Sequence, residues 1–312
     1  MTTTICGVDV SSETLDARIG REGATLRVER TAEGIAELAE FCRRHGVELV
    51  VMEATGGYEK LPFLLLWEAG IGCALTNPRA VRRFAAAMGV LEKTDRLDAG
   101  MIAWYGAAKG LVGQPPPSGA QRRLAALVGR LRQLTELVVA QNNQRRLQDE
   151  PLVLASIDAV VALARRQIRE LERQIAALIA ADPLWAAFDA SFRSIKGVAD
   201  RTVARLMAEL PEIGTLSQKA AGKLVGLAPL ARDSGQVSGR RRVRGGRAGV
   251  RSILFVVAEI VRRHDPDFAD FHRRLSAKGK PKKAIRIALA RKLLVRLNAK
   301  ARDVRRELAL AA

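Results

Sequence analysis

Three consecutive prolines, Pro115, Pro116 and Pro117, separate two parts of the chain with different hydrophobic patterns. Proline has no N–H and a fixed φ, so such a run can continue neither a helix nor a strand. Before the prolines, short apolar runs and alternating stretches indicate strands mixed with helices, whereas the chain after them has helical spacing only. We therefore predict an α/β domain followed by an all-α region.

The first part has the pattern of a mixed sheet. The predicted order is three strands, a helix, a strand, a helix, a strand and further helices, which is typical of a sheet with an antiparallel hairpin at one edge. The predicted strands are residues 5–10, 14–19, 24–30, 48–53 and 72–76. The predicted helices are residues 31–45, 58–69 and 93–109, with a further helical stretch that begins at Pro78.

Two long helices are predicted after the prolines. In each of them, apolar side chains alternate at spacings of three and four residues. The first helix carries Leu124, Leu127, Leu131, Leu134 and Val138, and the second carries Ile157, Val161, Ala164, Ile168, Leu171, Ile175 and Leu178. This spacing predicts a coiled coil, either between the two helices or between two protomers, although an amphipathic helix on a globular core gives a similar pattern.

The positive charge of the chain is concentrated towards its C-terminal end. Residues 1–186 hold 23 basic and 22 acidic side chains, whereas residues 187–312 hold 29 basic and 11 acidic ones. We therefore predict three domains, at residues 1–114, 115–186 and 187–312. A polyanion is the expected partner of the third domain.

Four carboxylates have placements that suggest a metal site. Asp9 lies within the first apolar strand, Glu53 ends the fourth strand, and Asp95 and Asp98 lie three residues apart at the start of a helix. A carboxylate in an apolar strand is unfavourable unless it is paired or bound to a cation. Two Mg²⁺ ions about 4 Å apart would offset the repulsion and activate a phosphodiester. The simpler alternatives are that Asp95 and Asp98 complement the helix dipole and that Glu53 is a surface residue.

A dense arginine run in the third domain indicates phosphate binding. Glycines interleave the run and would let a nucleic-acid backbone approach closely. Ser234 precedes it, and a serine among arginines can attack phosphorus, although a Ser-Gly pair in a loop is usually structural. Lys196 and Gly197 lie in a turn similar to a helix-hairpin-helix turn that holds a phosphate, with ordinary turn packing as the alternative. The arginines are Arg240, Arg241, Arg242, Arg244, Arg247 and Arg251.

Two sets of motifs occur along the chain. The first domain contains Gly7-Val8-Asp9-Val10, Met52-Glu53-Ala54-Thr55-Gly56-Gly57-Tyr58, Thr76-Asn77-Pro78 and Lys93-Thr94-Asp95-Arg96-Leu97-Asp98-Ala99. The third contains Leu224-Val225-Gly226-Leu227-Ala228-Pro229, Ser234-Gly235 and the arginine- and glycine-rich run before an apolar helix. In content and order, both sets resemble the DEDD transposases of bacterial insertion-sequence family 110 and its 1111-like relatives.

The resemblance implies a RuvC-like, RNase H-type N-terminal domain, a coiled-coil spacer and a small helical transposase domain. It identifies Asp9, Glu53, Asp95 and Asp98 with the family's metal-binding tetrad, which would hold two Mg²⁺ ions with Mn²⁺ as a substitute. It identifies Ser234 with the nucleophile that joins a DNA 5′ phosphate. The implied activity is that of a DNA transposase or recombinase that excises and integrates its element.

The resemblance also implies partners. These are double-stranded DNA from the element ends and the target, a structured guide RNA from the element, and further copies of the chain, as dimers that associate into tetramers. Base pairing by the guide would carry the sequence specificity. The chain shows no signal-peptide pattern, no apolar run of about 20 residues and no zinc or disulfide pattern among its three cysteines, so we expect a cytoplasmic protein without membrane contact.

Two alternatives to a serine recombinase stay open at the level of sequence. One is a metal-dependent junction nuclease of RuvC type that forms no covalent intermediate. The other is a non-enzymatic nucleic-acid-binding protein that uses only the basic region. The second leaves the acidic residues unexplained, because phosphate binding does not call for buried negative charge.

Overall fold

The computed structural model describes residues 3–90, 95–230 and 242–311, with the backbone alone for residues 95–97 and 311. The chain forms two compact units, Met1–Pro117 (unit 1) and Ser118–Ala312 (unit 2). The boundary falls directly after the three prolines. Unit 1 contains strands and helices, and the regular elements described in unit 2 are helices. The finer division of the second part at residue 187 stays a prediction.

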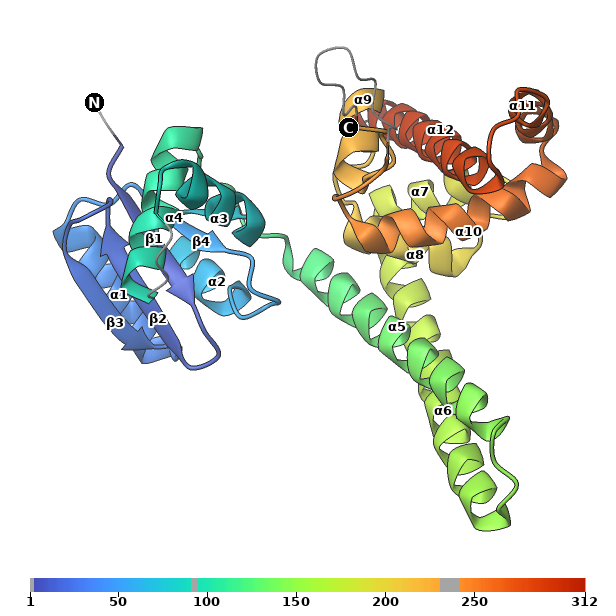
Figure 1. Cartoon of the computed structure of the whole chain (residues 1–312), viewed down its shortest axis with the longest axis horizontal. Helices are drawn as coiled ribbons and strands as arrows, with labels where there is room; N and C mark the ends of the chain where they lie inside the picture. Colours follow the sequence, from blue (N-terminus) through green and yellow to red (C-terminus); the bar gives the residue numbers. More distant parts are fainter. Residues whose placement is uncertain (1–2, 91–94, 231–241, 312) are drawn as a thin grey trace. The chain divides into compact units, whose positions relative to one another are not determined.

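Unit 1 is built on a mixed five-stranded sheet (Figure 1). The strands are β1 (Ile5–Val10), β2 (Thr14–Ile19), β3 (Thr25–Glu29), β4 (Leu49–Glu53) and β5 (Gly72–Thr76). They lie in the order β3-β2-β1-β4-β5. β2 runs antiparallel to both of its neighbours, whereas β1, β4 and β5 are parallel. The predicted mixed sheet with an antiparallel hairpin at one edge is therefore confirmed.

In the described part of unit 1, helices cover both faces of the sheet. They are α1 (Ala32–Arg44), α2 (Lys60–Glu68), α3 (Pro78–Ala87) and α4 (Asp95–Lys109). Successive side chains of a strand point to opposite faces. Val8 packs with Leu38 of α1 and Leu66 of α2, whereas Val51, on the other face, packs with Ile102 of α4. The unit therefore has three layers, with α1 and α2 on one side and α3 and α4 on the other.

Unit 2 begins with two long helices that pack against each other. They are α5 (Gly119–Arg145) and α6 (Pro151–Ala181), and Leu131 of α5 and Ile168 of α6 are buried in one hydrophobic cluster. Of the two pairings that the apolar spacing allowed, the structure shows the one within the chain.

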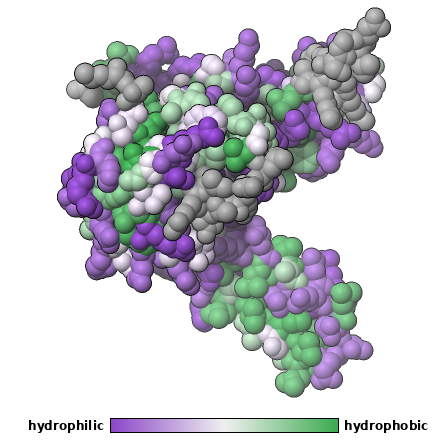
Figure 2. All heavy atoms as spheres, turned by 60° about the vertical axis from the view of Figure 1, so that its left-hand side comes forward, coloured by the Kyte–Doolittle hydropathy of each residue, from purple (hydrophilic) through white to green (hydrophobic). Residues whose placement is uncertain are grey.

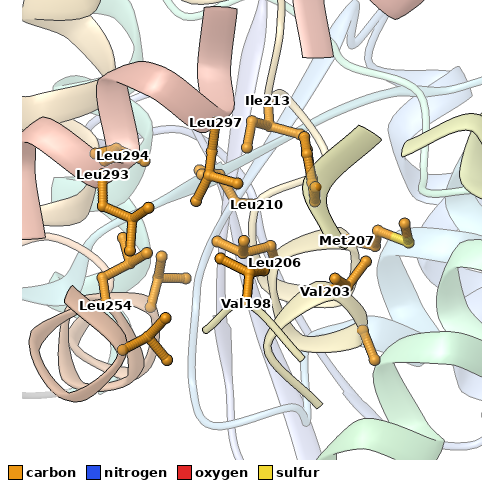
Figure 3. Packing of buried hydrophobic residues seen from close by; sticks show 14 of the residues in the cluster. Val198, Val203, Leu206, Met207, Leu210, Ile213, Leu254, Leu293, Leu294 and Leu297 are labelled. Carbon is orange, nitrogen blue, oxygen red and sulfur yellow. The ribbon is translucent and has the colours of Figure 1, made fainter. Parts of the chain in front are cut away.

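The other helices of unit 2 are α7 (Pro183–Arg193), α8 (Asp200–Glu209), α9 (Gln218–Val225), α10 (Ala248–His264), α11 (Pro266–Ala277) and α12 (Lys282–Ala311). Leu206, Leu254 and Leu297 extend from α8, α10 and α12 into their common core (Figure 3). In the residues that the structure covers, no single helix is long and apolar enough to cross a bilayer; only α6 and α7 taken together, bent by 111°, meet that length and composition.

Asn298 is a buried polar side chain that holds the loop between α8 and α9 on α12. Its Oδ1 accepts a hydrogen bond from the Gly214 N–H at 2.9 Å, and its Nδ2 donates to the Leu216 carbonyl at 2.8 Å. Gly214 has φ +90°, and a Cβ there would lie 2.8 Å from the carbonyl carbon of Ala301. The loop therefore packs directly on the helix backbone, with Asn298 satisfying its polar groups.

We expect Asn298→Ala to lower the free energy of unfolding of unit 2 by about 1–3 kcal/mol, because the Gly214 N–H loses its partner in a buried position. Chemical denaturation followed by far-UV circular dichroism measures this change. Asn143→Ala, on an exposed part of α5, is the control and should change the value by less than about 0.5 kcal/mol. Equal effects of the two substitutions would contradict the role given to Asn298.

Candidate functional site

Asp9 and Glu53 lie at the ends of neighbouring parallel strands. Val8 of β1 pairs with Met52 of β4, so the next position on each strand carries an acid. Matched positions on adjacent strands share a face of the sheet. Both carboxylates therefore lie on the face that carries Val51, which α3 and α4 cover. Both side chains are half-buried. The strand register therefore places two of the four predicted acids on neighbouring strands and on one face of the sheet.

Helix α4 brings a third predicted acid over the same face. A Cβ on Gly7 of β1 would overlap the carbonyl oxygen of Ala99 and would lie 2.5 Å from the backbone nitrogen of Ala103. Only glycine permits so close a crossing of helix and strand. Asp98 directly precedes Ala99, and Gly7 precedes Asp9 by two residues on the same face. The side chain of Asp95 lies outside the described part of the chain.

Asp16 is a further carboxylate on this face, which was not among the predicted site residues. It lies directly opposite Asp9 in the antiparallel pairing of β1 and β2. Asp16 is 9% exposed, and the Arg27 Nη1 lies 3.7 Å from the Asp16 Oδ1. The alternation over residues 14–19 predicted the strand. Asp16 could have been predicted as a neighbour of Asp9 from the register of the hairpin, which pairs the two residues.

The donor set suits a hard divalent cation, because every acid on this face offers carboxylate oxygens. Asp9 and Glu53 are neighbours at the ends of β1 and β4, and Asp98 lies on α4, which covers the same face of the sheet. Among the side chains that the structure describes, no three acidic, histidine or cysteine groups are close enough to hold a metal ion. Asp95, the fourth predicted ligand, is not among those side chains.

Glu59 orders the loop that follows Glu53. It is 7% exposed, and its Oε2 accepts hydrogen bonds from the backbone N–H groups of Thr55 at 3.1 Å and Gly57 at 2.8 Å. Gly56 and Gly57 have φ values of +73° and +116°, which favour glycine. The motif after β4 is therefore a glycine turn closed by a buried carboxylate. The glycines are visible as a motif in the sequence, whereas the role of Glu59 depends on its burial, which no local pattern indicates.

The candidate nucleophile Ser234 lies outside the described residues, as do Arg240 and Arg241. Leu230 and Arg242, which flank this stretch, form an antiparallel bridge in which the Leu230 N–H donates to the Arg242 carbonyl at 3.1 Å. The chain therefore leaves and re-enters the described fold at adjoining positions. The role of Ser234 stays a prediction.

Two arginines of the basic run have partners within the protein. Arg247 makes two hydrogen bonds to the carboxylate of Glu212, at 2.5 and 2.6 Å. Burial is the largest single influence and acts to raise the pKa of Glu212, but the hydrogen bonds from Arg247, a backbone hydrogen bond and the positive charge of Arg247 together lower that pKa. Arg251 donates to the carbonyl oxygens of Val225 and Gly245. Arg242 and Arg244 are exposed, so they are the described members of the run most open to a ligand.

The glycines of the run also have a structural reason. Gly246 has φ +65°, and a Cβ there would lie 2.5 Å from the Gly226 nitrogen and from the Leu224 carbonyl oxygen. Gly226 itself ends α9 in the left-handed region, with φ +75°. The glycine-rich run therefore packs on the Leu224–Pro229 motif. This packing is by itself a reason for glycine at position 246, in addition to any approach of a nucleic-acid backbone.

The predicted phosphate-binding turn joins α7 and α8. Lys196 is exposed, whereas a Cβ on Gly197, where φ is +100°, would lie 3.0 Å from Ile260 Cγ2 of α10. Ala199 occupies the N-cap of α8 and provides no side-chain cap, so the first backbone N–H groups of that helix have no side-chain acceptor there. Packing explains Gly197, and the phosphate contact of Lys196 stays a prediction.

Two family models match successive parts of the chain. Residues 6–148 match the DEDD transposase model of IS110, and residues 189–273 match the transposase model of the IS116/IS110/IS902 family. The chain is 29% identical over 306 residues to the pilin gene-inverting proteins of Moraxella lacunata and Moraxella bovis, with 94% of each chain covered. It is 32% identical to an uncharacterized 43.6 kDa protein of insertion element IS110 from Streptomyces coelicolor, over 49% of this chain and 37% of that protein.

An α/β unit with acids at the ends of two neighbouring strands, followed by a basic helical unit, and transposase models that match both, define an enzyme of DNA recombination. The chain belongs to the IS110 family of DEDD transposases, as the sequence motifs indicated. Its activity is that of a DNA transposase or recombinase.

We expect Glu59→Ala to lower the free energy of unfolding of unit 1 by about 1–3 kcal/mol, because two backbone N–H groups lose a charged acceptor. Thermal and urea unfolding of the full chain measure this loss. Glu68→Ala, at the exposed C-terminal end of α2, is the matched control and should change stability by less than about 0.5 kcal/mol. If Glu59→Ala were as stable as this control, the loop would not depend on the buried carboxylate.

Proposed function

We propose that the protein excises and integrates an insertion element by Mg²⁺-dependent cleavage and rejoining of DNA strands. The observation that carries the proposal is the juxtaposition of Asp9 and Glu53 at the ends of β1 and β4, within the segment that matches the DEDD transposase model. The names of the two Moraxella relatives describe inversion of a pilin gene. From them we extend to this chain only the breakage and rejoining of DNA.

Unit 1 is proposed to have a RuvC-like, RNase H-type fold. The strand order β3-β2-β1-β4-β5, the antiparallel β2 and the helices on both faces support this assignment. Acids at the ends of two central strands agree with it as well. The fold would then supply the rigid platform on which a metal site requires its ligands.

Asp9, Glu53, Asp95 and Asp98 would hold two Mg²⁺ ions, with Mn²⁺ as a substitute because it also takes oxygen ligands. When bound, such ions polarise a phosphodiester and stabilise its leaving oxygen. The chain itself sets the geometry, since the strands fix two carboxylates and α4 carries Asp98 above them. Asp16 adds negative charge opposite Asp9, which strengthens the attraction for a cation, and Arg27 partly offsets that charge.

Ser234 is the proposed nucleophile. Its Oγ forms a bond to the phosphorus of a DNA 5′ phosphate, while the bond from that phosphorus to the 3′ oxygen of the preceding nucleotide breaks. The serine loses one proton and the departing 3′ oxygen gains one, so charge and atoms balance. A different 3′ hydroxyl then reverses the step and rejoins the strands. Arg242 and Arg244 would hold the phosphate during both steps.

The proposed partners are DNA, a guide RNA encoded by the element, and further copies of the chain. Exposed apolar side chains gather on the part of the α5–α6 hairpin distant from the other helices of unit 2 (Figure 2). Leu147 and Leu152 are 83% and 78% exposed there, and Val153 and Leu163 are exposed as well. Such patches mark protein contacts. We therefore propose that the hairpin joins protomers into dimers that associate into tetramers.

Replacing Asp9 should remove both metal binding and activity. A cation at about ten times its dissociation constant stabilises a protein by ~1.4 kcal/mol, which corresponds to about 5 °C in the melting temperature of a unit of this size. We expect Mg²⁺ or Mn²⁺ to raise the melting temperature of the parent chain and of the exposed-acid control Glu37→Gln, and to leave Asp9→Asn unchanged. Recombination in Mg²⁺ should be lost only in Asp9→Asn. Full metal stabilisation of Asp9→Asn would exclude Asp9 as a ligand.

Ser234→Ala tests the covalent step and separates the recombinase from a junction nuclease. We expect the parent chain to form an SDS-resistant protein–DNA adduct on its substrate and Ser234→Ala to form none. Ser238→Ala, which changes a second serine four residues after Ser234 and before the arginine run, is the control and should keep the adduct. A nuclease that uses the acids alone would cleave equally well in both variants and leave free ends, and that result would contradict the serine mechanism.

A further inference from the structure

Helix α3 presents three arginines on one exposed face. Arg79, Arg82 and Arg83 are separated by three and four residues, so they line the same side of the helix. The opposite side faces the protein, where Val81 is buried and Phe84 packs edge-on against Trp104 of α4, with ring centroids 5.0 Å apart. The helix is therefore anchored by its apolar side, and its basic side faces solvent.

These three arginines have no acid beside them in the described fold. Some other exposed arginines of the protein do, as in the pairs Arg145–Asp158 at 2.8 Å and Arg173–Glu170 at 2.7 Å. Among the residues that the structure describes, no ion pair or hydrogen bond involves the side chain of an α3 arginine, and α3 itself contains no acid. The positive charge of this face is therefore not neutralised within the described fold.

Helix α3 begins beside the carboxylates of the candidate site. Thr76, the last residue of β5, pairs with Glu53, and the Ala54 N–H donates to the Thr76 carbonyl at 3.0 Å. Asn77 then caps the helix by accepting a hydrogen bond from the Arg79 N–H at 2.9 Å. The first arginine thus lies three residues beyond the strand end that adjoins Glu53, and the other two follow within one turn of the helix.

We propose that the arginine face of α3 binds the phosphodiester backbone of the DNA strand that enters the carboxylate site. This inference rests on the proposed function, in which the site acts on DNA. Carboxylates repel a phosphodiester, so a site of this kind needs fixed positive charge beside it to hold the strand in place. Guanidinium groups suit that task because they remain charged and can form two hydrogen bonds to one phosphate. Unit 1 then contributes a DNA contact of its own, separate from the basic run of unit 2.

A matched control lies on the other face of the same unit. Arg43 and Arg44 are adjacent, exposed arginines in the last turn of α1, which packs on the face of the sheet opposite α3. The double variants R82Q/R83Q and R43Q/R44Q change the net charge equally. A third variant, R82K/R83K, keeps the charge of the α3 face and serves as a rescue.

The test measures binding of the full chain to a labelled DNA duplex by fluorescence anisotropy at several salt concentrations, in EDTA so that no cleavage occurs. Each phosphate contact contributes about 0.9 to the slope of log affinity against log salt. We expect R82Q/R83Q to reduce that slope by about 1.8 and to weaken binding about tenfold at low salt, and R82K/R83K to restore most of the slope. R43Q/R44Q should bind like the parent chain.

Equal slopes for R82Q/R83Q and R43Q/R44Q would overturn the proposal, and so would a loss of binding confined to an RNA of the same length. If R82Q/R83Q unfolds at a lower temperature than the parent chain, R79Q is compared with R82K/R83K instead. The slope of log affinity against log salt should then fall by about 0.9 in R79Q and should not fall in R82K/R83K. None of these measurements requires metal or Ser234. Failure here therefore leaves the proposed chemistry standing, and failure of the Asp9 or Ser234 tests leaves the DNA contact standing.

Discussion

The close crossing of α4 over β1 at Gly7 is the contact on which the candidate site depends. Because a side chain at this position would overlap the helix backbone, the crossing fixes both the height and the lateral position of α4. This packing places α4, which carries Asp98, over the face of the sheet that carries Asp9 and Glu53. Because like charges repel, the acids need such support, and the apolar interior of unit 1 supplies its free energy.

The strands of unit 1 could be predicted because their alternation is local, and the two units could be separated because the prolines interrupt both patterns. The site was predicted less completely. Asp16 and Glu59 were missed because their roles arise from hairpin register and from burial, neither of which a local pattern contains. Asp9 and Glu53 could be proposed because an acid within or at the end of an apolar strand is conspicuous in the sequence itself, and their role as ligands stays a prediction.

Two arginines of the basic run already bind groups of the protein itself, and phosphate binding by the run stays a prediction. Six arginines among glycines predict phosphate binding, yet Arg247 and Arg251 are hydrogen-bonded within the protein and Gly246 packs on Gly226. Charge density alone does not reveal which guanidinium groups already have partners. The α3 arginines are the opposite case. They lie in a part of the chain whose net charge is close to zero, so the charge distribution of the sequence does not indicate them as a binding surface.

We propose that acids distant in the sequence share a divalent cation at the ends of β1 and β4. Anomalous diffraction at the manganese edge, from crystals of the full chain grown with Mn²⁺, tests it directly. We expect a manganese peak about 2.2 Å from carboxylate oxygens of both Asp9 and Glu53. Manganese bound only elsewhere on the protein, with these two carboxylates more than about 6 Å from any peak, would contradict it.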